Sequence, residues 1–163
     1  MDDYRKKILN ADEAVKIREK IASEKKIFVF TNGCFDILHP GHIRYLWEAR
    51  NLGNYLLVAV NTDSSVKKLK GQSRPVFGEL SRAEMLAAFE FVDGVVLFEE
   101  DTPYSLIKKL IPNILVKGGD WPDEKIVGYD IVKESGGIVR NIAFQVGFST
   151  TSIIDKIVKL NHG

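Results

Sequence analysis

Short apolar runs recur along the chain, separated by stretches in which apolar positions return every three or four residues. The runs are rich in Val, Ile, Leu and Phe, which is typical of strands buried on both faces of a parallel sheet. These predicted strands lie at residues 27–31, 56–60, 95–98, 114–116 and 138–142. The predicted helices cover residues 11–25, 40–52, 63–69, 81–91, 103–110, 124–135 and 150–160.

This alternation of strand and helix predicts right-handed crossovers and a sheet covered by helices on both faces. We therefore expect an α/β fold with a doubly wound, parallel five-stranded sheet in a single domain. Residues 1–25 are expected to form an N-terminal helical extension packed on the domain, which residues 26–163 form. Ligands of such folds bind beyond the carboxyl ends of the strands, where the strand order reverses.

The segment that joins the first predicted strand to the next helix contains two histidines, His39 and His42, three residues apart. Pro40 suits the first turn of a helix because it has no amide hydrogen to leave unpaired. Free backbone amides and the positive end of the helix dipole favour anions at such a helix start, and a three-residue step places both imidazoles on one side. The segment therefore predicts a phosphate site.

Two other interpretations apply to the same segment. Cys34, Asp36, His39 and His42 are all possible metal ligands, but neither a paired CxxC nor an HExxH spacing occurs in the chain. The histidines also suit plain capping and solvation of a helix start. Cys34, the single cysteine, is interpreted as a small residue of the core and is assigned no chemistry.

Composition restricts the partners of the protein. The chain has 163 residues, 45% of them hydrophobic, and its 23 basic residues nearly balance 22 acidic ones. This balance gives no bulk electrostatic attraction to nucleic acid or to an acidic membrane surface, so neither is expected as a partner. The charged N-terminus lacks the apolar core of a signal peptide, and no apolar run approaches spanning length. We expect a cytoplasmic protein.

The other strand ends carry groups that suit phosphates and sugars. The second strand leads into Asn61-Thr62-Asp63 and then to Lys70, next to an irregular segment that contains Arg74. Lys117-Gly118-Gly119-Asp120-Trp121 follows the fourth strand, and Gly147-Phe148-Ser149-Thr150-Thr151 precedes the last helix. Solvated helix faces for the lysines, ordinary turn chemistry for Gly-Gly-Asp and N-capping for the hydroxyls are the alternative explanations of these segments. The GxGxxG and GxxxxGK[ST] phosphate motifs are missing.

Taken together, these motifs resemble the cytidylyltransferase-like nucleotidyltransferases, the HxGH group with a Rossmann-like fold, over residues ~26–160. Within that group the sequence is most similar to the D-glycero-β-D-manno-heptose 1-phosphate adenylyltransferases, through Phe30–Asp36, Leu69–Gly71 and Leu115–Asp120. The related glycerol phosphate enzymes carry Arg-Thr-Glu-Gly where this chain reads Phe144-Gln145-Val146-Gly147. The missing arginine weakens a glycerol 3-phosphate assignment.

The resemblance implies a reaction in which a sugar 1-phosphate attacks the α-phosphorus of ATP and releases pyrophosphate. It implies catalytic roles for His39, His42 and Lys70, the last exchangeable with Lys67 or Lys68. It implies a nucleotide site made of Asn32, Gly33, Cys34, Phe35, His39, Gly41, His42, Arg82, Lys117, Gly118, Gly119, Ser149 and Thr150. It implies a sugar phosphate site made of Asp36, Asp63, Arg74, Asp120 and Trp121. For Arg82 a structural salt bridge is the alternative.

The resemblance also implies Mg²⁺ held mainly by the ATP phosphates, with no dedicated protein metal site. It implies a homodimer, and a separate sugar kinase, because in many bacteria this activity is one half of a two-domain protein whose other half is such a kinase. Two alternative functions remain at this point. One is a CTP-dependent glycerol 3-phosphate cytidylyltransferase, and the other is a nucleotide-binding regulator without turnover.

Overall fold

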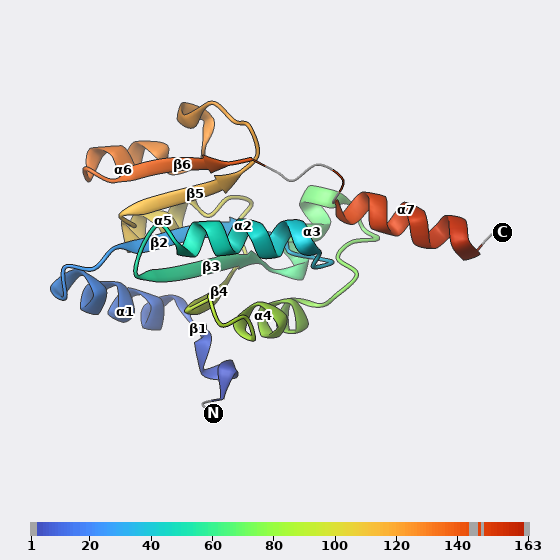
Figure 1. Ribbon diagram of the computed structural model, residues 1–163, viewed down its shortest axis with the longest axis horizontal. Helices are drawn as coiled ribbons and strands as arrows, with labels where there is room; N and C mark the ends of the chain where they lie inside the picture. The colour runs from blue at the N-terminus through green and yellow to red at the C-terminus, as the bar shows by residue number, and fades with distance from the viewer. Residues whose placement is uncertain (1–2, 144–146, 148, 162–163) are drawn as a thin grey trace.

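Among the residues that the computed structural model describes (3–143, 147 and 149–161), six parallel strands form one sheet in the order β1-β4-β3-β2-β5-β6 (Figure 1). The strands are β1 (Ile8–Leu9), β2 (Phe28–Gly33), β3 (Tyr55–Asn61), β4 (Gly94–Phe98), β5 (Ile114–Gly118) and β6 (Ile138–Ile142). The five longer strands confirm the predicted parallel sheet. The sixth, β1, pairs with Val95 and Val96, and its two residues are too few to show a periodic pattern.

Seven helices and two 3₁₀ turns connect the strands in the described part of the chain. The helices are α1 (Ala11–Ser23), α2 (Pro40–Arg50), α3 (Asp63–Lys70), α4 (Glu79–Ala87), α5 (Tyr104–Leu110), α6 (Tyr129–Glu134) and α7 (Thr150–Asn161). The 3₁₀ turns are η1 (Tyr4–Lys7) and η2 (Asp123–Lys125). The N-terminal segment is therefore not only helical, since η1 and β1 precede α1.

The prediction of a single helix at residues 124–135 is wrong in one respect, because the structure has two elements there, η2 and α6. Gly128 separates them with a φ of +88°, a conformation that side-chain-bearing residues rarely adopt. A Cβ at this position would lie 2.7 Å from Cδ1 of Ile107 on α5. The break allows α6 to pack closely on the neighbouring helix, which a helical sequence pattern does not reveal.

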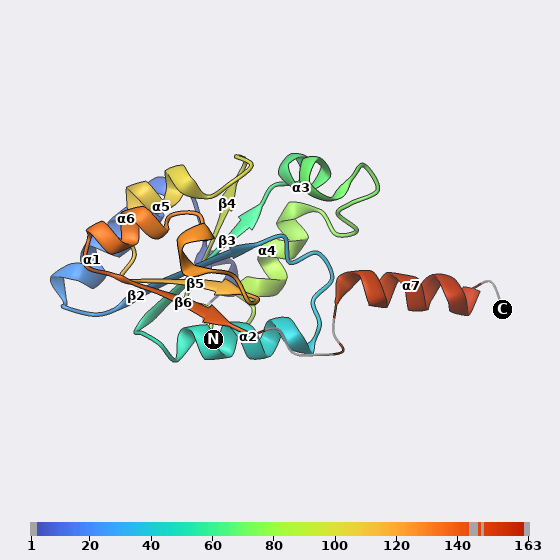
Figure 2. The ribbon, with the colours of Figure 1, turned by 90° about the horizontal axis from the view of Figure 1, so that it is seen from above.

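Two hydrophobic layers cover the sheet, one on each face (Figure 2). Phe30, Leu57 and Leu115 point towards α1, α5 and α6, and α1 contributes Ala14 and Ile21 to this layer. Val58 and Val116 point towards α2 and α4 on the opposite face. Because side chains alternate along a strand, each strand supplies both layers, as the predicted doubly wound fold requires.

The strand order reverses between β2 and β5. The chain moves outward from β2 to β3 and β4, and then crosses to the other side of β2 to form β5 and β6. In sheets of this type the crevice at such a reversal, beyond the carboxyl ends of the strands, is where ligands bind. The segment with His39 and His42 leaves β2 at this crevice.

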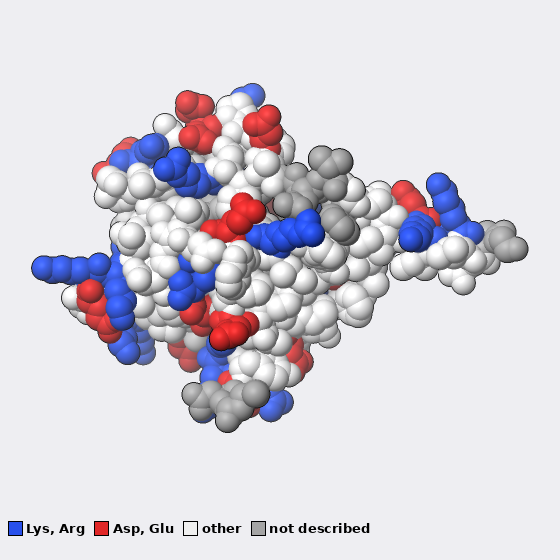
Figure 3. All heavy atoms as spheres, viewed as in Figure 1, with Lys and Arg blue, Asp and Glu red and all other residues white. Residues whose placement is uncertain are grey.

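The last helix, α7, projects from the body of the protein in both ribbon views (Figures 1 and 2). Its described residues include none that is buried. Its first turn nevertheless lies beside the first turn of α2 in both views. Acidic and basic side chains are interspersed over the face seen in Figure 3, in keeping with the near balance of charge. No helix formed by the described residues is both long and apolar enough to cross a bilayer.

Candidate functional site

The two signature histidines lie together at the start of α2. His39 is the N-cap residue, Pro40 begins the helix, and the amide of His42 donates to the carbonyl of His39 at 2.9 Å. The two imidazole rings stack with their centroids 3.8 Å apart. The helix start thus presents paired rings together with the backbone amide of Gly41, since Pro40 has no N–H and the amide of His42 is already bonded.

The environment of His42 keeps its ring uncharged at neutral pH. Burial lowers the pKa of His42 to about 4, and the neighbouring His39 adds to the lowering. Burial also lowers the pKa of His39. The Nδ1 atom of His42 is buried and has no hydrogen-bond partner among the described residues. A bound anion favours the charged form of an imidazole, so a phosphate at this site raises both pKa values.

The turn between β2 and α2 is shaped by Gly33 and Phe35. Phe35 adopts a left-handed backbone conformation, with φ of +47°, and its buried ring packs edge-on against His42 with a centroid distance of 5.4 Å. A Cβ at Gly33 would lie 3.0 Å from the same ring. The glycine is therefore needed for the ring to support the histidines from beneath.

Four charged residues form an ion-pair network beside this turn, in which Asp36 and Arg82 are buried and Asp63 and Arg74 are partly exposed. The Asp36 carboxylate accepts from Arg74 Nε at 2.6 Å and from the amides of Val76 and Phe77 at 2.7 and 3.1 Å. Arg82, with no exposed surface, donates to Asp63 Oδ1 at 2.8 Å and to the carbonyls of Cys34 and Phe77 at 2.6 and 2.9 Å. We call Asp36, Asp63, Arg74 and Arg82 the buried network. It joins the turn after β2, the start of α3 and the flap, residues 71–78.

The buried network shows protein partners for four residues that were expected to contact ligands. The carboxylate of Asp36, which is 2% exposed, is engaged by Arg74 and by the flap amides. Arg74 and Asp63 are partly exposed, and each holds a protein partner in the same network. Arg82 is fully buried and paired with Asp63, which is the structural salt bridge given as the alternative for it. Charged groups removed from water need partners, and here the protein supplies them.

A cavity of about 360 Å³ opens on the other side of the β2 end and contains six of the expected residues. These are Asn32, Gly33, Cys34, Lys70, Lys117 and Trp121. Asn61, Leu69, Asp101, Thr102, Pro103, Lys125, Ile126 and Val127 complete its lining. We call it the lysine cavity, because three lysines and one aspartate are its charged residues. Its size is within the range of small-molecule sites.

Electrostatics in the lysine cavity differ from those of the buried network. Lys117 Nζ lies 3.5 Å from Asn32 Oδ1, and burial lowers the pKa of this lysine. Burial raises the pKa of the Cys34 thiol, which therefore remains protonated and is a poor nucleophile. Its Sγ lies 3.8 Å from Asn61 Oδ1. This agrees with the interpretation that Cys34 carries no chemistry.

The loop after β5 brings Trp121 to the rim of the cavity. Gly118 and Gly119 are buried at the strand end, where the amide of Gly119 donates to the carbonyl of Ile142. Trp121 is 54% exposed, and Asp120 beside it is exposed and does not line the cavity. Asn141 donates from Nδ2 to the carbonyl of Trp121 and to Asp123, at 2.8 and 2.7 Å. This amide therefore holds the loop in place.

The hydroxyls before α7 lie near the histidines. Ser149 caps the helix, since its Oγ accepts from the amide of Ser152 at 3.0 Å, and Thr150 begins the helix. The first turns of α7 and α2 lie side by side in Figures 1 and 2. N-capping, one of the two explanations offered for these hydroxyls, is confirmed for Ser149. Residue 148 of this motif lies outside the described residues. So do residues 144–146, which were compared with the Arg-Thr-Glu-Gly run of the glycerol phosphate enzymes.

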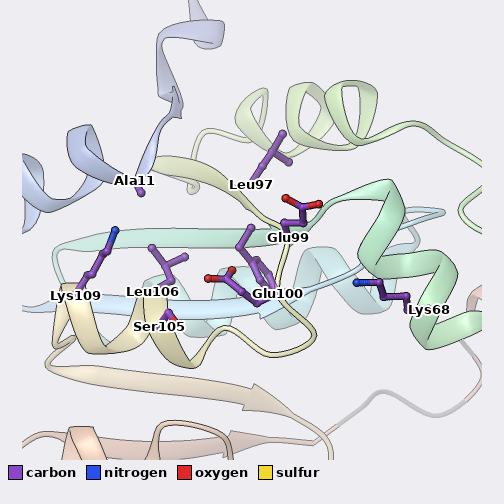
Figure 4. Close-up of a pocket in the computed structure, with 9 residues that line it drawn as sticks. Ala11, Lys68, Leu97, Glu99, Glu100, Ser105, Leu106 and Lys109 are labelled. Atoms are coloured by element: carbon purple, nitrogen blue, oxygen red, sulfur yellow. The ribbon is translucent and has the colours of Figure 1, made fainter.

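A second hollow, of about 490 Å³, lies between the start of α1, the end of β4 and α5 (Figure 4). Lys68 and Lys109 reach towards it from α3 and α5, with Glu99 and Glu100 between them. Lys68 Nζ lies 3.8 Å from Asp101 Oδ1, and Lys70 is the lysine of α3 that lines the lysine cavity. No group of three or more His, Cys, Asp or Glu among the described residues is placed to hold a metal ion.

Sequence reasoning missed several residues of the site. Asn61, at the end of β3, was noted as part of the motif after the second strand but was given no role, and it lines the cavity. Asn141 gives a weaker signal of the same kind, within β6. Ile126 and Val127 reach the cavity through the turn between η2 and α6, which the pattern predicted as one helix. No local signal identifies them.

Comparisons with known proteins agree with this geometry. A family model described as cytidylyltransferase-like matches residues 30–156. The bifunctional protein HldE of Campylobacter jejuni subsp. doylei is 56% identical over 155 residues, and that of Geotalea uraniireducens is 50% identical over 151 residues. These alignments cover 95% and 93% of this chain but only 32% and 31% of the relatives, so the chain spans about a third of their length.

Two solved structures resemble the fold. A lipopolysaccharide core biosynthesis protein from Thermoplasma volcanium GSS1 is 31% identical with a TM-score of 0.59, covering 74% of this chain and 97% of that one. Pantoate-beta-alanine ligase from Francisella tularensis has a TM-score of 0.60 at 16% identity, covering 96% of this chain and 79% of that one. The second likeness concerns the fold alone.

Proposed function

Because this chain belongs to the cytidylyltransferase-like family, we propose that it is an adenylyltransferase that joins ATP to D-glycero-β-D-manno-heptose 1-phosphate. The products are ADP-heptose and pyrophosphate. One observation carries the proposal. The stacked His39 and His42 at the start of α2 lie on one side of the β2 end, and a lysine-lined cavity large enough for a sugar phosphate lies on the other.

The chemistry is a direct transfer between two phosphate groups. An oxygen of the sugar phosphate forms a bond to the α-phosphorus of ATP, and the bond from that phosphorus to the bridging oxygen of the β-phosphate breaks. Pyrophosphate carries away the electron pair. Such transfers need positioning and charge neutralisation but no covalent nucleophile from the protein, which agrees with the protonated thiol of Cys34.

The histidine side is assigned to the triphosphate. A neutral imidazole donates one hydrogen bond, and the backbone amide of Gly41 in the first turn of α2 supplies a further donor beside it. The lowered pKa of His42 means that its ring is neutral before ATP binds. As negative charge builds up around the α-phosphorus, that ring then stabilises it by donating a hydrogen bond or by taking up a proton.

The N-terminal turn of α7 is assigned to the β- and γ-phosphates. Ser149 and Thr150 lie at a second helix start, and the ribbon views place it next to the first. Two helix dipoles then act on one polyanion. The Mg²⁺ that such a reaction uses is proposed to bind mainly to the ATP phosphates.

The assignment of the sugar and of the cellular setting of the reaction is based on the similar proteins. HldE proteins and the lipopolysaccharide core biosynthesis protein are similar to this chain over 93–95% and 74% of its length. HldE is named as bifunctional, and this chain matches one third of it. We propose that a separate sugar kinase acts earlier in the same route, that the reaction takes place in the cytoplasm, and that the enzyme forms a homodimer.

The family description favours one second candidate, a CTP-dependent glycerol 3-phosphate cytidylyltransferase. A pyrophosphate-release assay that crosses ATP and CTP with heptose 1-phosphate, glycerol 3-phosphate and other sugar phosphates separates the two. The proposal expects release only with ATP and a sugar 1-phosphate. Release with CTP and glycerol 3-phosphate contradicts it, and nucleotide binding without release from any pair supports a regulator without turnover.

A further inference from the structure

Three polar residues end the central strands on one face of the sheet. Along β2 and β3, Phe28, Phe30, Leu57 and Ala59 point into the layer of α1, α5 and α6, and so does Leu115 on β5. Two residues further along each strand, on the same face, stand Asn32, Asn61 and Lys117. On this face of the sheet, the apolar side chains of each strand are therefore followed by an amide or ammonium group, and these groups form the floor of the lysine cavity.

Lys117 is the central charge of that floor. Its Nζ lies 3.5 Å from Asn32 Oδ1, and Asn141 is its partner in the parallel register with β6. Lys70, at the end of α3, lines the same cavity, and its charge acts on Lys117. Neither lysine forms an ion pair with any residue that the structure describes. Asp101, the one carboxylate in the lining, lies 3.8 Å from Lys68.

An ammonium group that is partly removed from water and faces a second ammonium is unfavourable unless an anion joins them. The rest of the lining suits a sugar, since Asn32 offers an amide group and Trp121 a flat apolar surface at the rim. The lysine cavity is thus built for a small, phosphorylated, hydroxylated ligand.

The position of Lys117 separates it from the nucleotide site that the resemblance implied. The histidines stand on the other face of the sheet, where Phe35 supports them and where Val116, the neighbour of Lys117, points. On the basis of the proposed function, we infer that Lys117 binds the phosphate of the acceptor sugar, with Lys70 on the opposite wall, and so selects a phosphorylated acceptor. Its charge reduces the repulsion between that phosphate and the triphosphate across Gly33.

The test compares the Michaelis constants of the two substrates in Lys117→Met and Lys117→Arg. Loss of a charge-assisted hydrogen bond to a phosphate raises the KM for heptose 1-phosphate about 10- to 100-fold in Lys117→Met. The KM for ATP stays within about threefold, because the histidine side is unchanged. Lys117→Arg recovers part of the acceptor affinity, since it keeps the charge. Lys108→Met, on the exposed side of α5, is the matched control.

Calorimetry with heptose 1-phosphate alone supplies a second readout that does not depend on turnover. Lys117→Met is expected to weaken this binding by the same factor while its thermal midpoint stays at or above that of the parent chain, because a desolvated charge is removed. A raised KM for ATP with an unchanged KM for the sugar phosphate overturns the inference, as does unchanged binding by calorimetry. Failure of the parent chain to release pyrophosphate with any acceptor contradicts the proposed function instead, and binding of sugar 1-phosphates then still tests Lys117.

Discussion

Two groups of charged side chains lie at the same edge of the sheet, and they differ in what neutralises them. In the buried network, Asp36 holds Arg74 and Asp63 holds Arg82, at 2.6 and 2.8 Å. In the lysine cavity, Lys70 and Lys117 have no carboxylate partner among the described residues. The first group ties the flap and the turn after β2 to the body of the protein. The second is open to a ligand.

This difference shows why the type of a residue is a poor guide to its role here. Asp36, Arg74 and Arg82 stand in motifs that resemble ligand-binding motifs, yet each is satisfied by the protein. Lys117 stands in a motif that is equally compatible with an ordinary turn, yet it points into a cavity. A charge with protein partners is already neutralised within the fold, whereas a cavity-lining charge without a carboxylate partner is a candidate for ligand binding.

The largest expected effect concerns Arg82. Arg82→Met leaves Asp63 and two carbonyls without their donor and is expected to lower the free energy of unfolding by about 3–5 kcal/mol, measured by urea denaturation. Arg140→Met, at an exposed position of β6, is the control and is expected to change it by less than about 0.5 kcal/mol. Unchanged stability together with a raised KM for ATP supports the nucleotide contact that the sequence suggested, and contradicts the buried network as a structural element.

Next in size is the effect of His42→Ala on turnover. Removal of a group that stabilises charge in the transition state is expected to lower kcat by at least ~10²-fold in the pyrophosphate assay. Ile43→Ala serves as the control, because Ile43 is the next residue of α2 and its apolar side chain is partly exposed. Turnover equal to that of the parent chain in His42→Ala contradicts a catalytic role for this ring.

A double-mutant cycle on Asp36 and Arg74 tests the link between the turn and the flap. Asp36→Asn keeps an acceptor for the amides of Val76 and Phe77 but loses its charge, and is expected to lower the free energy of unfolding by about 1.5–3 kcal/mol. The double mutant Asp36→Asn/Arg74→Met is expected to lose less free energy of unfolding than the sum of the losses in the two single mutants, because both substitutions remove the same interaction. Strict additivity argues that the pair is not coupled.

The smallest effect is the pH dependence of stability through His42. Its pKa is about 4 in the folded protein and near 6.5 when unfolded, so between these values the unfolded chain binds more protons. The contribution of the neutral His42 ring to the free energy of unfolding is complete above about pH 7 and is lost as the pH falls from about 6.5 to 4. After allowance for partial exposure, this loss is roughly 1–2 kcal/mol. Urea denaturation of the parent chain and of His42→Asn at pH 7 and pH 5 measures it. An identical loss in both chains contradicts the assignment to His42.

The sequence alone determined the fold class and the pairing of the two histidines. Five strands and their parallel orientation follow from apolar runs that alternate with helical periods, and these are local properties. The histidine pair at a helix start is also local, because both rings, Pro40 and the amide of Gly41 lie within a few residues. The local backbone conformation of such a segment fixes the relative positions of its side chains, so the sequence is enough to predict them.

Only the tertiary structure decided which charges are satisfied by the protein. Asp36 meets Arg74 across 38 positions of the chain, and Lys117 meets Asn32 across 85. Periodicity tells which face of a strand or helix a side chain occupies, as for Lys117 beyond Leu115, but not which distant residue stands opposite. That choice depends on how the elements pack, and here it separates the residues that hold the protein together from those left to bind a ligand.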